Sequence, residues 1–150
     1  MHLAQLNVGR LVGEPDGPDV AEFMTAIPAM NLLAESSPGF VWRLADDEGP
    51  GATGIRFPGH EDDQRYIVNL SVWEDFDSLR HYVARSGHGM YLRRRREWFE
   101  KPPQPTTVLW WVPDGHTPSV DEAAERLGRL RTHGPTQEAF DMANPHPPAG

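Results

Sequence analysis

The residues with the clearest chemical potential in this chain lie together in residues 85–100, RSGHGMYLRRRREWFE. An unperturbed histidine titrates near neutral pH, so His88 is a candidate for giving and taking protons. The glycines on either side of it would let the backbone bend and bring the ring close to a ligand. Tyr91 and Tyr82 are candidate phenol donors. The structural alternative stays open: a histidine that hydrogen-bonds a carbonyl at a helix break, and tyrosines that pack at an amphipathic boundary.

Four consecutive arginines, residues 93–96, follow in the same stretch. They cannot all point the same way, because consecutive residues of a helix are turned by about 100°. If Trp98 and Phe99 face inward, Arg94 and Arg95 lie nearest to that side, three and four positions earlier. We predict that Arg95 binds an anionic substrate group. The alternative is that these arginines pack their stems on the protein and pair with carboxylates.

The charge of the chain argues against nucleic acid as the partner of this arginine run. Six basic and two acidic residues give residues 85–101 a net charge of +4, so the rest of the chain, with −8 overall, carries −12. A nucleic-acid binder usually presents its basic stripe on a surface that attracts phosphate. No apolar run approaches the roughly 18 residues of a membrane span. The first ten residues also lack the charged start and apolar centre of a signal peptide. We therefore expect a cytoplasmic protein that binds neither nucleic acid nor membrane.

Metal and nucleotide sites are not indicated by the spacing of the residues. The chain has no cysteine, and its seven histidines do not form a ligand pattern, so we expect no non-haem metal site. Haem stays open, because a single axial histidine, His88 or His81, is enough to ligate it. Gly49, Gly51 and Gly54 have the spacing of a dinucleotide-binding turn, but an acidic segment with Pro58-Gly59 follows instead of a helix. We interpret this segment as a hairpin loop.

Apolar patterning predicts the order β-α-β-β-α-β plus a C-terminal helix. The strands are expected at residues 2–11, 39–44, 66–73 and 106–112, and the helical segments at 19–37, 74–101 and 118–134. Asp19 and Glu22 form a capping-box pattern, Asp75 or Asp77 is expected to cap the second helical segment, and Pro28 should kink or split the first. The second segment should break near His88. A single domain over residues 1–134 and a Pro-rich tail over 135–150, held at most by Phe140, complete the predicted organisation.

This order is that of the ferredoxin-like α+β fold, a four-stranded antiparallel sheet whose residues alternate between two faces. One face is nearly all apolar, and we assign it to the helices: Ala4, Leu6, Val8, Phe40, Trp42, Leu44, Tyr66, Val68, Leu70, Val72, Val108, Trp110 and Val112. The other face is mixed: Leu3, Gln5, Asn7, Val41, Arg43, Ile67, Asn69, Ser71, Trp73, Leu109 and Trp111.

The composition of the mixed face suits neither full exposure to water nor burial in a closed core. Its large apolar side chains would make an extensive exposed patch, and each buried amide without a partner would cost about 1–3 kcal/mol. A half-apolar cavity with a few convergent polar groups is typical of small-ligand sites, and a second subunit could close it. The alternative is a polar-seamed dimer interface without a ligand. From this face we predict substrate-binding residues Gln5, Asn7, Arg43, Asn69, Ser71, Trp73 and Trp111.

Several long stretches of the sequence resemble the bacterial family called domain of unknown function 3291. They are HLAQLNVGRL, SPGFVWRL, VNLSVWEDFDSLRHYV, SGHGMYLRRRREWFE and LWWVPDGHTPSVDEAAERLGRLRTHGPTQEAF, and they span nearly the whole chain. That family is similar to the dimeric α+β barrel superfamily, in which two ferredoxin-like sheets pack face to face. The superfamily includes antibiotic-biosynthesis monooxygenases that use no metal or flavin, polyketide-tailoring enzymes and haem-binding branches. The resemblance implies the fold, a homodimer and a cavity between sheet and helices; it supplies no catalytic residues.

These observations lead us to expect an enzyme that acts on an aromatic or polyketide-like metabolite by proton transfer, with no cofactor. A metal- and flavin-free monooxygenase or a related tailoring or cyclising enzyme belongs to that class, and the assignment is by analogy at superfamily level. We predict His88 and Tyr91 as its catalytic residues. Two alternatives stay open: a non-catalytic ligand-binding or structural homodimer, and a haem protein.

Overall fold

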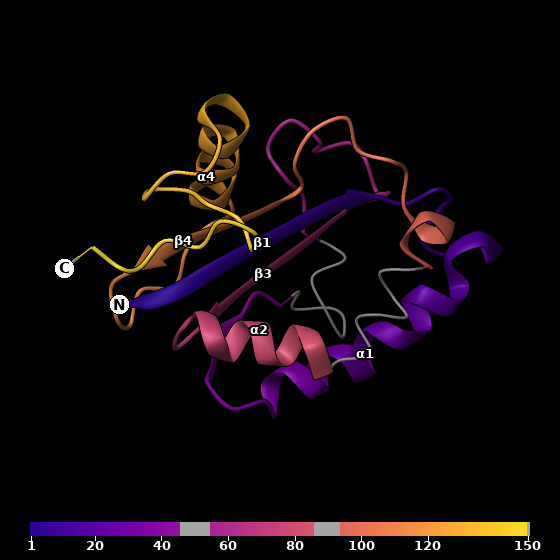
Figure 1. Ribbon diagram of the computed structural model, residues 1–150. Coiled ribbons are helices and arrows are strands. Elements are labelled where there is room, and N and C mark those ends of the chain that lie inside the picture. Colours follow the sequence, from indigo (N-terminus) through magenta and orange to yellow (C-terminus); the bar gives the residue numbers. More distant parts are fainter. Residues whose placement is uncertain (46–54, 86–93, 150) are drawn as a thin grey trace.

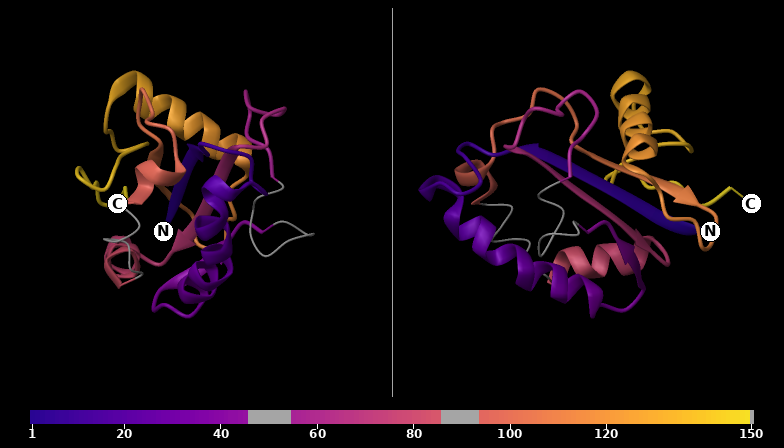
Figure 2. Two further views of the ribbon diagram at one scale, coloured as in Figure 1. Left: turned by 90° about the vertical axis from the view of Figure 1, so that its right-hand side faces the viewer. Right: turned by 180° about the vertical axis from the view of Figure 1, so that it is seen from behind.

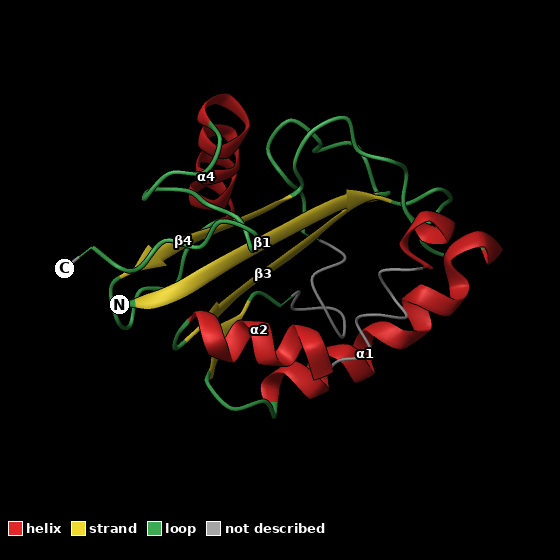
Figure 3. Cartoon of the chain, viewed as in Figure 1, coloured by secondary structure: helices red, strands yellow, loops and turns green. Residues whose placement is uncertain are grey.

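The computed structural model describes residues 1–45, 55–85 and 94–149 of the chain. Its elements follow the predicted order, with a short 3-10 helix before the first α-helix and a helical turn at residues 94–98. Their bounds are β1 His2–Arg10, η1 Pro18–Val20, α1 Ala21–Glu35, β2 Phe40–Arg43, β3 Tyr66–Trp73, α2 Phe76–Arg85, β4 Thr107–Val112 and α4 Val120–His133. The predicted α+β class and the four strands are confirmed, each strand to within one residue at either end (Figure 3).

The four strands form one antiparallel sheet in the order β2-β3-β1-β4. The register between β1 and β3 places Asn7 opposite Asn69, Gln5 opposite Ser71 and Leu3 opposite Trp73. Residues that are opposite each other point to the same face of a sheet. The polar residues of the mixed face therefore lie next to one another across the two central strands.

The sheet lies between two helical layers, with α4 on one side and α1 and α2 on the other (Figures 1 and 2). Our assignment of the faces is wrong in this respect. The all-apolar face packs against α4 through Ala123, Leu127 and Leu130. The mixed face lies under α1 and α2 of the same chain. Alternation separates the two faces of a strand but does not say which helix covers each of them.

Strand β2 departs from the expected alternation. The pairing of β2 with β3 shifts between Phe40 and Trp42, and Val41 lies at this shift. Because of this shift, Phe40 and Trp42 pack on opposite faces of the sheet although they are two residues apart. Phe40, expected on the apolar face, accordingly packs in the mixed-face cluster, where its ring meets that of Trp73 at 5.5 Å.

Local sequence signals explain most helix ends. Ser119 caps α4 by accepting a hydrogen bond from the backbone N–H of Glu122 at 3.0 Å, and Gly134 ends this helix with φ of +74°. Asp75 caps α2 through the N–H of Ser78 at 2.8 Å, as expected.

Helix α1 starts and continues differently from the prediction. Its N-cap is Val20, without a side-chain cap, so the expected capping box of Asp19 is wrong. The carboxylate of Glu22 binds Arg94 instead of a backbone N–H. Pro28 lies inside the helix and does not split it into two. Tertiary contacts have overridden both local signals.

The C-terminal tail runs along the free edge of β4. Phe140 is completely buried, and it exchanges two backbone hydrogen bonds with Leu109, at 2.8 and 2.9 Å. Phe140 thus holds the tail in the way we expected, and its ring completes the mixed-face cluster beside Leu3 and Leu109. The division into a domain of residues 1–134 and a tail stays a prediction.

Candidate functional site

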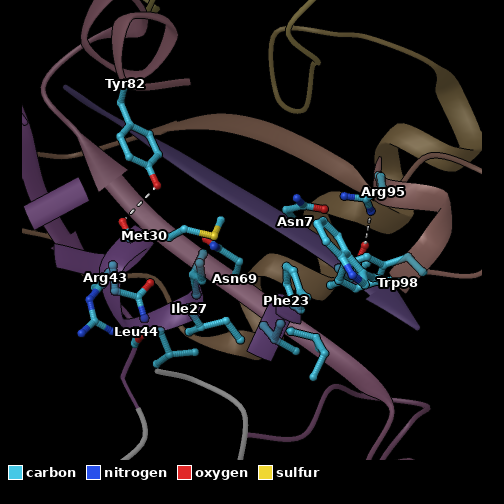
Figure 4. A pocket seen from close by; sticks show the side chains of 17 residues that line it. Asn7, Phe23, Ile27, Met30, Arg43, Leu44, Asn69, Tyr82, Arg95 and Trp98 are labelled. Atoms are coloured by element: carbon cyan, nitrogen blue, oxygen red, sulfur yellow. Dashed lines mark hydrogen bonds between the residues drawn. The ribbon is translucent and has the colours of Figure 1, made fainter. Parts of the chain in front are cut away.

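A cavity of about 150 Å³ lies between the mixed face of the sheet and helix α1 (Figure 4). Helix α1 contributes Phe23, Ile27 and Met30, which are spaced by four and three residues and therefore share one side of the helix. The sheet contributes Asn7 and Asn69, together with neighbouring residues of β1 and β3. The cavity is thus built where β1 and β3 pass over α1.

The two ends of the cavity differ. Arg95, Trp98 and Phe99 lie at the end next to Phe23, and Arg43, Leu44 and Tyr82 lie at the end next to Met30 (Figure 4). The polar groups of the wall are amides, guanidinium groups and a phenol. No aspartate or glutamate is among the described residues that line it. The described wall therefore favours a ligand with electron-rich or anionic oxygens.

Arg95 is a half-buried guanidinium without a carboxylate partner among the described residues. Its Cζ lies 4.9 Å from the centre of the Phe99 ring, and Nη2 is 3.5 Å from the backbone oxygen of Val8. Burial lowers the pKa of Arg95, because the charged form is the one that loses solvation. This cation is the strongest electrostatic feature of the described wall.

Arg94, the preceding residue, has the opposite role. Its guanidinium binds Glu22 of α1 at 2.5 Å and Glu97 at 2.8 Å, and it lies 4.7 Å from the Trp98 ring centre. The two uses that the sequence left open for these arginines are therefore divided between neighbours. Arg94 pairs with carboxylates at the surface, and Arg95 lines the cavity.

Gly9 makes room for this arrangement. A Cβ atom at this position would lie 2.7 Å from Cδ1 of Phe99 and 3.3 Å from Nη2 of Arg95. Contacts below about 3 Å require a neighbour to move. The absence of a side chain at Gly9 thus allows the ring and the guanidinium to pack directly on β1.

Asn7 and Asn69 face each other across β1 and β3 on the floor of the cavity. Oδ1 of Asn7 is buried and has no hydrogen-bond partner among the described residues. Asn69 is exposed even though its strand is central, because its side chain points into the open volume. These amides are available to orient a ligand.

Gln5, Ser71 and Trp73 form a separate polar chain that does not line the cavity. The indole N–H of Trp73 donates to Ser71 Oγ at 2.9 Å, and that hydroxyl donates to Gln5 Oε1 at 2.9 Å. The structure thus brings these three predicted residues together with one another, next to the cavity. Trp73 Nε1, Ser71 Oγ and Gln5 Oε1 are therefore occupied by one another.

Trp111 lies apart from the cavity. Its indole N–H donates to the backbone oxygen of His146 at 2.7 Å, and the ring faces a shallow hollow beside Phe76 and the tail. Arg43 does line the cavity, but its Nε binds Glu35 at 2.7 Å, so its charge is partly neutralised.

Tyr82 is a cavity residue that we considered only as a possible donor. Its hydroxyl donates to the backbone oxygen of Met30 at 3.3 Å, and its ring stacks on Trp73 at 5.0 Å. Burial raises the pKa of the phenol, so Tyr82 stays protonated at neutral pH. Through Trp73 it connects the polar chain to the cavity.

Several apolar residues of the wall were not among the predicted site residues. Phe23, Ile27 and Met30 belong to the apolar period of α1, and Trp98 was expected to face inward. The period found the correct side of the helix, but no sequence signal shows that this side stands off from the sheet. His88, Tyr91 and the three glycines Gly49, Gly51 and Gly54 lie outside the described residues.

Among the described residues, no group of three or more histidine, aspartate or glutamate side chains could hold a metal ion. None of the described helices is long and apolar enough to cross a membrane.

The fold is shared with proteins of known structure. The chain is similar to SnoaB from Streptomyces nogalater, described as a cofactor-independent oxygenase, in a variant with one asparagine replaced by alanine. The identity is 19%, the TM-score is 0.50, and the match covers 79% of this chain and 98% of SnoaB. A protein of unknown function from Nitrosomonas europaea matches with 13% identity and a TM-score of 0.48, over 79% of this chain and 95% of that one.

None of the curated proteins is significantly similar to the chain. The model of one protein family, the domain of unknown function DUF3291, matches residues 2–150. This match covers nearly the whole sequence and agrees with the resemblance carried by its long blocks. The chain belongs to the DUF3291 family.

Proposed function

We propose that this protein is an enzyme that binds an aromatic or polyketide-like metabolite in the cavity under α1 and transforms it without a metal or flavin. One observation carries the proposal: the cavity combines apolar walls with two facing amides and a guanidinium that has no carboxylate partner among the described residues. Sites of this composition bind small ligands and orient them. The fold shared with SnoaB, a cofactor-independent oxygenase, supports the same class by analogy.

In this proposal the substrate supplies its own reactivity. A phenol or an enolisable ketone loses a proton, and Arg95 stabilises the resulting anion in a partly buried site, where the charge of the guanidinium acts strongly. Asn69 and Asn7 orient the ring, and Phe23 and Trp98 hold its faces. Loss of the Arg95 charge should therefore affect the transition state more than the binding of a neutral substrate.

A monooxygenase reaction in this site uses molecular oxygen as the oxidant. The carbanion formed from a CH₂ group gives electrons to O₂, a C–O bond forms, and protonation gives a hydroperoxide. Loss of one water leaves the carbonyl, so one oxygen atom enters the product and the other leaves as water. Cyclisation of a polyketide would use the same enolate without oxygen.

The described wall contains no histidine or carboxylate that could accept the proton at neutral pH. We therefore keep His88 as the proposed base and Tyr91 as a proposed donor. An acidic substrate that ionises in solution would need neither. Gln5, Ser71 and Trp73 act in this proposal through Tyr82, as a support behind the wall.

The experiment is turnover of a panel of anthrones, naphthols and linear polyketide mimics, followed by oxygen consumption and mass spectrometry. The variants are Asn69→Ala, His88→Ala and Arg95→Met, with the exposed Arg96→Met as the matched control. We expect product from the wild type and from Arg96→Met, and a loss of about 100-fold in kcat for Arg95→Met, the size expected for one oxyanion contact. Turnover that is unaffected by all three substitutions would contradict the proposed site.

A non-catalytic binding protein is the second candidate, and the lack of a proton acceptor in the described wall favours it. Tight binding without turnover of any ligand would support this candidate. In the haem alternative, His81 is a poor candidate for the axial ligand, because it is exposed and does not line the cavity. A visible spectrum with a Soret band from the purified protein would restore it.

A homodimer stays part of the proposal. The resemblance implies that the sheets of two copies pack face to face, and within this chain α4 covers the all-apolar face (Figure 1). The association of two copies is tested by the mass of the protein in solution. Sedimentation velocity of the full chain measures this directly.

A further inference from the structure

Two polar groups meet the same short segment of β1 at one end of the cavity: Arg95, which has no carboxylate partner among the described residues, and Asn7. Arg95 Nη2 is 3.5 Å from the backbone oxygen of Val8 and 3.3 Å from the Cβ position of Gly9. Asn7 precedes these residues, and its buried Oδ1 has no partner in the described part of the chain. Asn7 and Gly9 are two residues apart on β1 and share one face of the sheet, and Figure 4 draws Asn7 and Arg95 at the same end of the cavity. The pair is a candidate binding subsite.

The two groups have opposite needs. A guanidinium has only N–H donors and a positive charge, so it requires an acceptor and prefers an anionic one. The Oδ1 atom of an amide accepts hydrogen bonds only, so it requires an O–H or N–H donor. A plain carboxylate would satisfy Arg95 and leave Asn7 unsatisfied. A plain alcohol would satisfy Asn7 and leave the charge of Arg95 uncompensated.

Neighbouring charges of the protein do not fill this need. Glu22 at the start of α1 and Glu97 of the helical turn both bind Arg94. Glu100 binds Arg10 and Arg65 on the far side of β1. In the described part of the chain these three carboxylates are thus held by other arginines, and none of them pairs with Arg95. Arg94 acts here as a positioning residue, since it retains two carboxylates at the surface.

The walls at this end are aromatic and fixed. The Phe23 ring lies 5.5 Å from Trp98 and 5.0 Å from Phe99, the second pair edge to face. Both partner rings are buried. A flat aromatic ligand fits such walls better than a flexible chain, because ring contacts form with little loss of conformational freedom.

We propose that the Asn7–Arg95 pair recognises an aromatic group that carries an anionic oxygen directly beside a hydroxyl, such as an ortho-hydroxy acid or the monoanion of an ortho-diphenol. The anionic oxygen binds Arg95, and the hydroxyl donates to Asn7 Oδ1. This inference rests on the proposed function and names the substrate class for it. It concerns binding alone, so it is tested without turnover.

The test compares three probes by isothermal titration calorimetry: 2-hydroxybenzoate, 4-hydroxybenzoate and benzyl alcohol. We expect 2-hydroxybenzoate to bind about 3- to 10-fold more tightly than its 4-isomer, the effect of one additional hydrogen bond. Benzyl alcohol should bind at least tenfold more weakly than either acid. Equal affinities for the two acids would overturn the role of Asn7, and equal affinity for the alcohol would overturn that of Arg95.

Two pairs of variants separate the contributions. Arg95→Met should weaken both acids at least tenfold, and the exposed control Arg96→Met should change neither. Asn7→Leu should abolish the preference between the acids. Asn7→Asp places a carboxylate beside Arg95 and should abolish acid binding while keeping a polar side chain on β1. Binding to Asn7→Asp at the wild-type affinity contradicts the subsite even if Asn7→Leu fails to fold.

The binding experiment can fail or succeed independently of the proposed enzymatic reaction. Selective acid binding without turnover of any substrate would support the subsite and disprove the enzyme. Turnover that Arg95→Met leaves intact, with no binding of either acid to the wild type, would support the enzyme and disprove the subsite.

Discussion

The two faces of the sheet are made by alternate residues of the same strands, and they end in different environments. On the α4 side, the apolar residues of β1 and β4 are at most 2% exposed. On the α1 side, part of the face packs and part lines a cavity. The covering helices account for the difference. Helix α4 buries three side chains against the sheet, whereas Ala34 is the single buried residue of α1.

The mixed face itself is divided along its length. Leu3, Trp73 and Leu109 are closed over by α2 and by Phe140 of the tail. Here Gln5 and Ser71 satisfy each other. At the Asn7 end nothing among the described residues plays that role for the amide oxygen. Leaving a buried polar atom without a partner costs stability, and this cost is the reason for proposing a ligand contact at Asn7.

The largest effect should come from the closed face. Trp110 is completely buried between β4 and α4, and its indole N–H donates to Glu122 at 2.9 Å. We expect Trp110→Ala to lower the free energy of unfolding by about 3–5 kcal/mol, because it removes a large core side chain. Phe23→Ala, which enlarges an existing cavity, should cost clearly less. Urea denaturation measures both, and a similar loss for the two variants would show that the faces do not differ in packing.

A second comparison uses two glycines. Gly9→Ala should destabilise the protein by about 1–3 kcal/mol, because the new Cβ meets Phe99 at 2.7 Å. It should also weaken the binding of acidic aromatics, since Arg95 packs on the same position. Gly128→Ala in α4 is the control: its Cβ meets nothing within 4 Å, and we expect a gain of about 0.5–1 kcal/mol from helix propensity.

Loss of stability in both glycine variants would mean that the close approach at Gly9 has no special importance. Binding of 2-hydroxybenzoate is therefore also measured, without denaturant and well below the unfolding temperature. Weaker binding by the folded Gly9→Ala protein would indicate a local displacement of Arg95 and not a general loss of stability.

The sequence predicts the composition of the two faces of the sheet. It does not predict which polar residues of the mixed face are left to line the cavity. Alternation identified the polar residues of one face, and their order along the strands implied that they lie together. It could not show that Gln5 finds a partner while the oxygen of Asn7 has none in the described part of the chain, because this depends on register and on the reach of individual side chains. It also could not assign α4 to the apolar face. The period of a helix reports which side is apolar and not which surface it meets.

Ser71 and Asn69 provide a third, smaller contrast on the same strand. Ser71→Ala removes the hydroxyl that joins Trp73 to Gln5, and we expect a loss of about 1–2 kcal/mol in stability. Ligand affinity should hardly change, because Ser71 does not line the cavity. Asn69→Ala should show the opposite pattern, since the exposed amide contributes little to folding. Thermal unfolding and calorimetric titration of both variants test the division, and it is wrong if the two substitutions affect the same property.

The smallest effect concerns the surface ion pair that joins the two walls of the cavity. Hydrogen bonding to Arg94 lowers the pKa of Glu22 below its ordinary value of 4.5. A carboxyl group with a depressed pKa in the folded state stabilises the protein above its unfolded pKa, and this contribution is lost as the pH falls through the folded pKa. The wild type should therefore be slightly more stable than Glu22→Gln at pH 7, and the two should converge below about pH 4. Because Glu22 is exposed, salt should screen the difference. Unfolding curves at pH 7 and pH 3, with and without 1 M NaCl, measure it; a difference that persists at pH 3 would mean that Glu22 acts through packing and not through its charge.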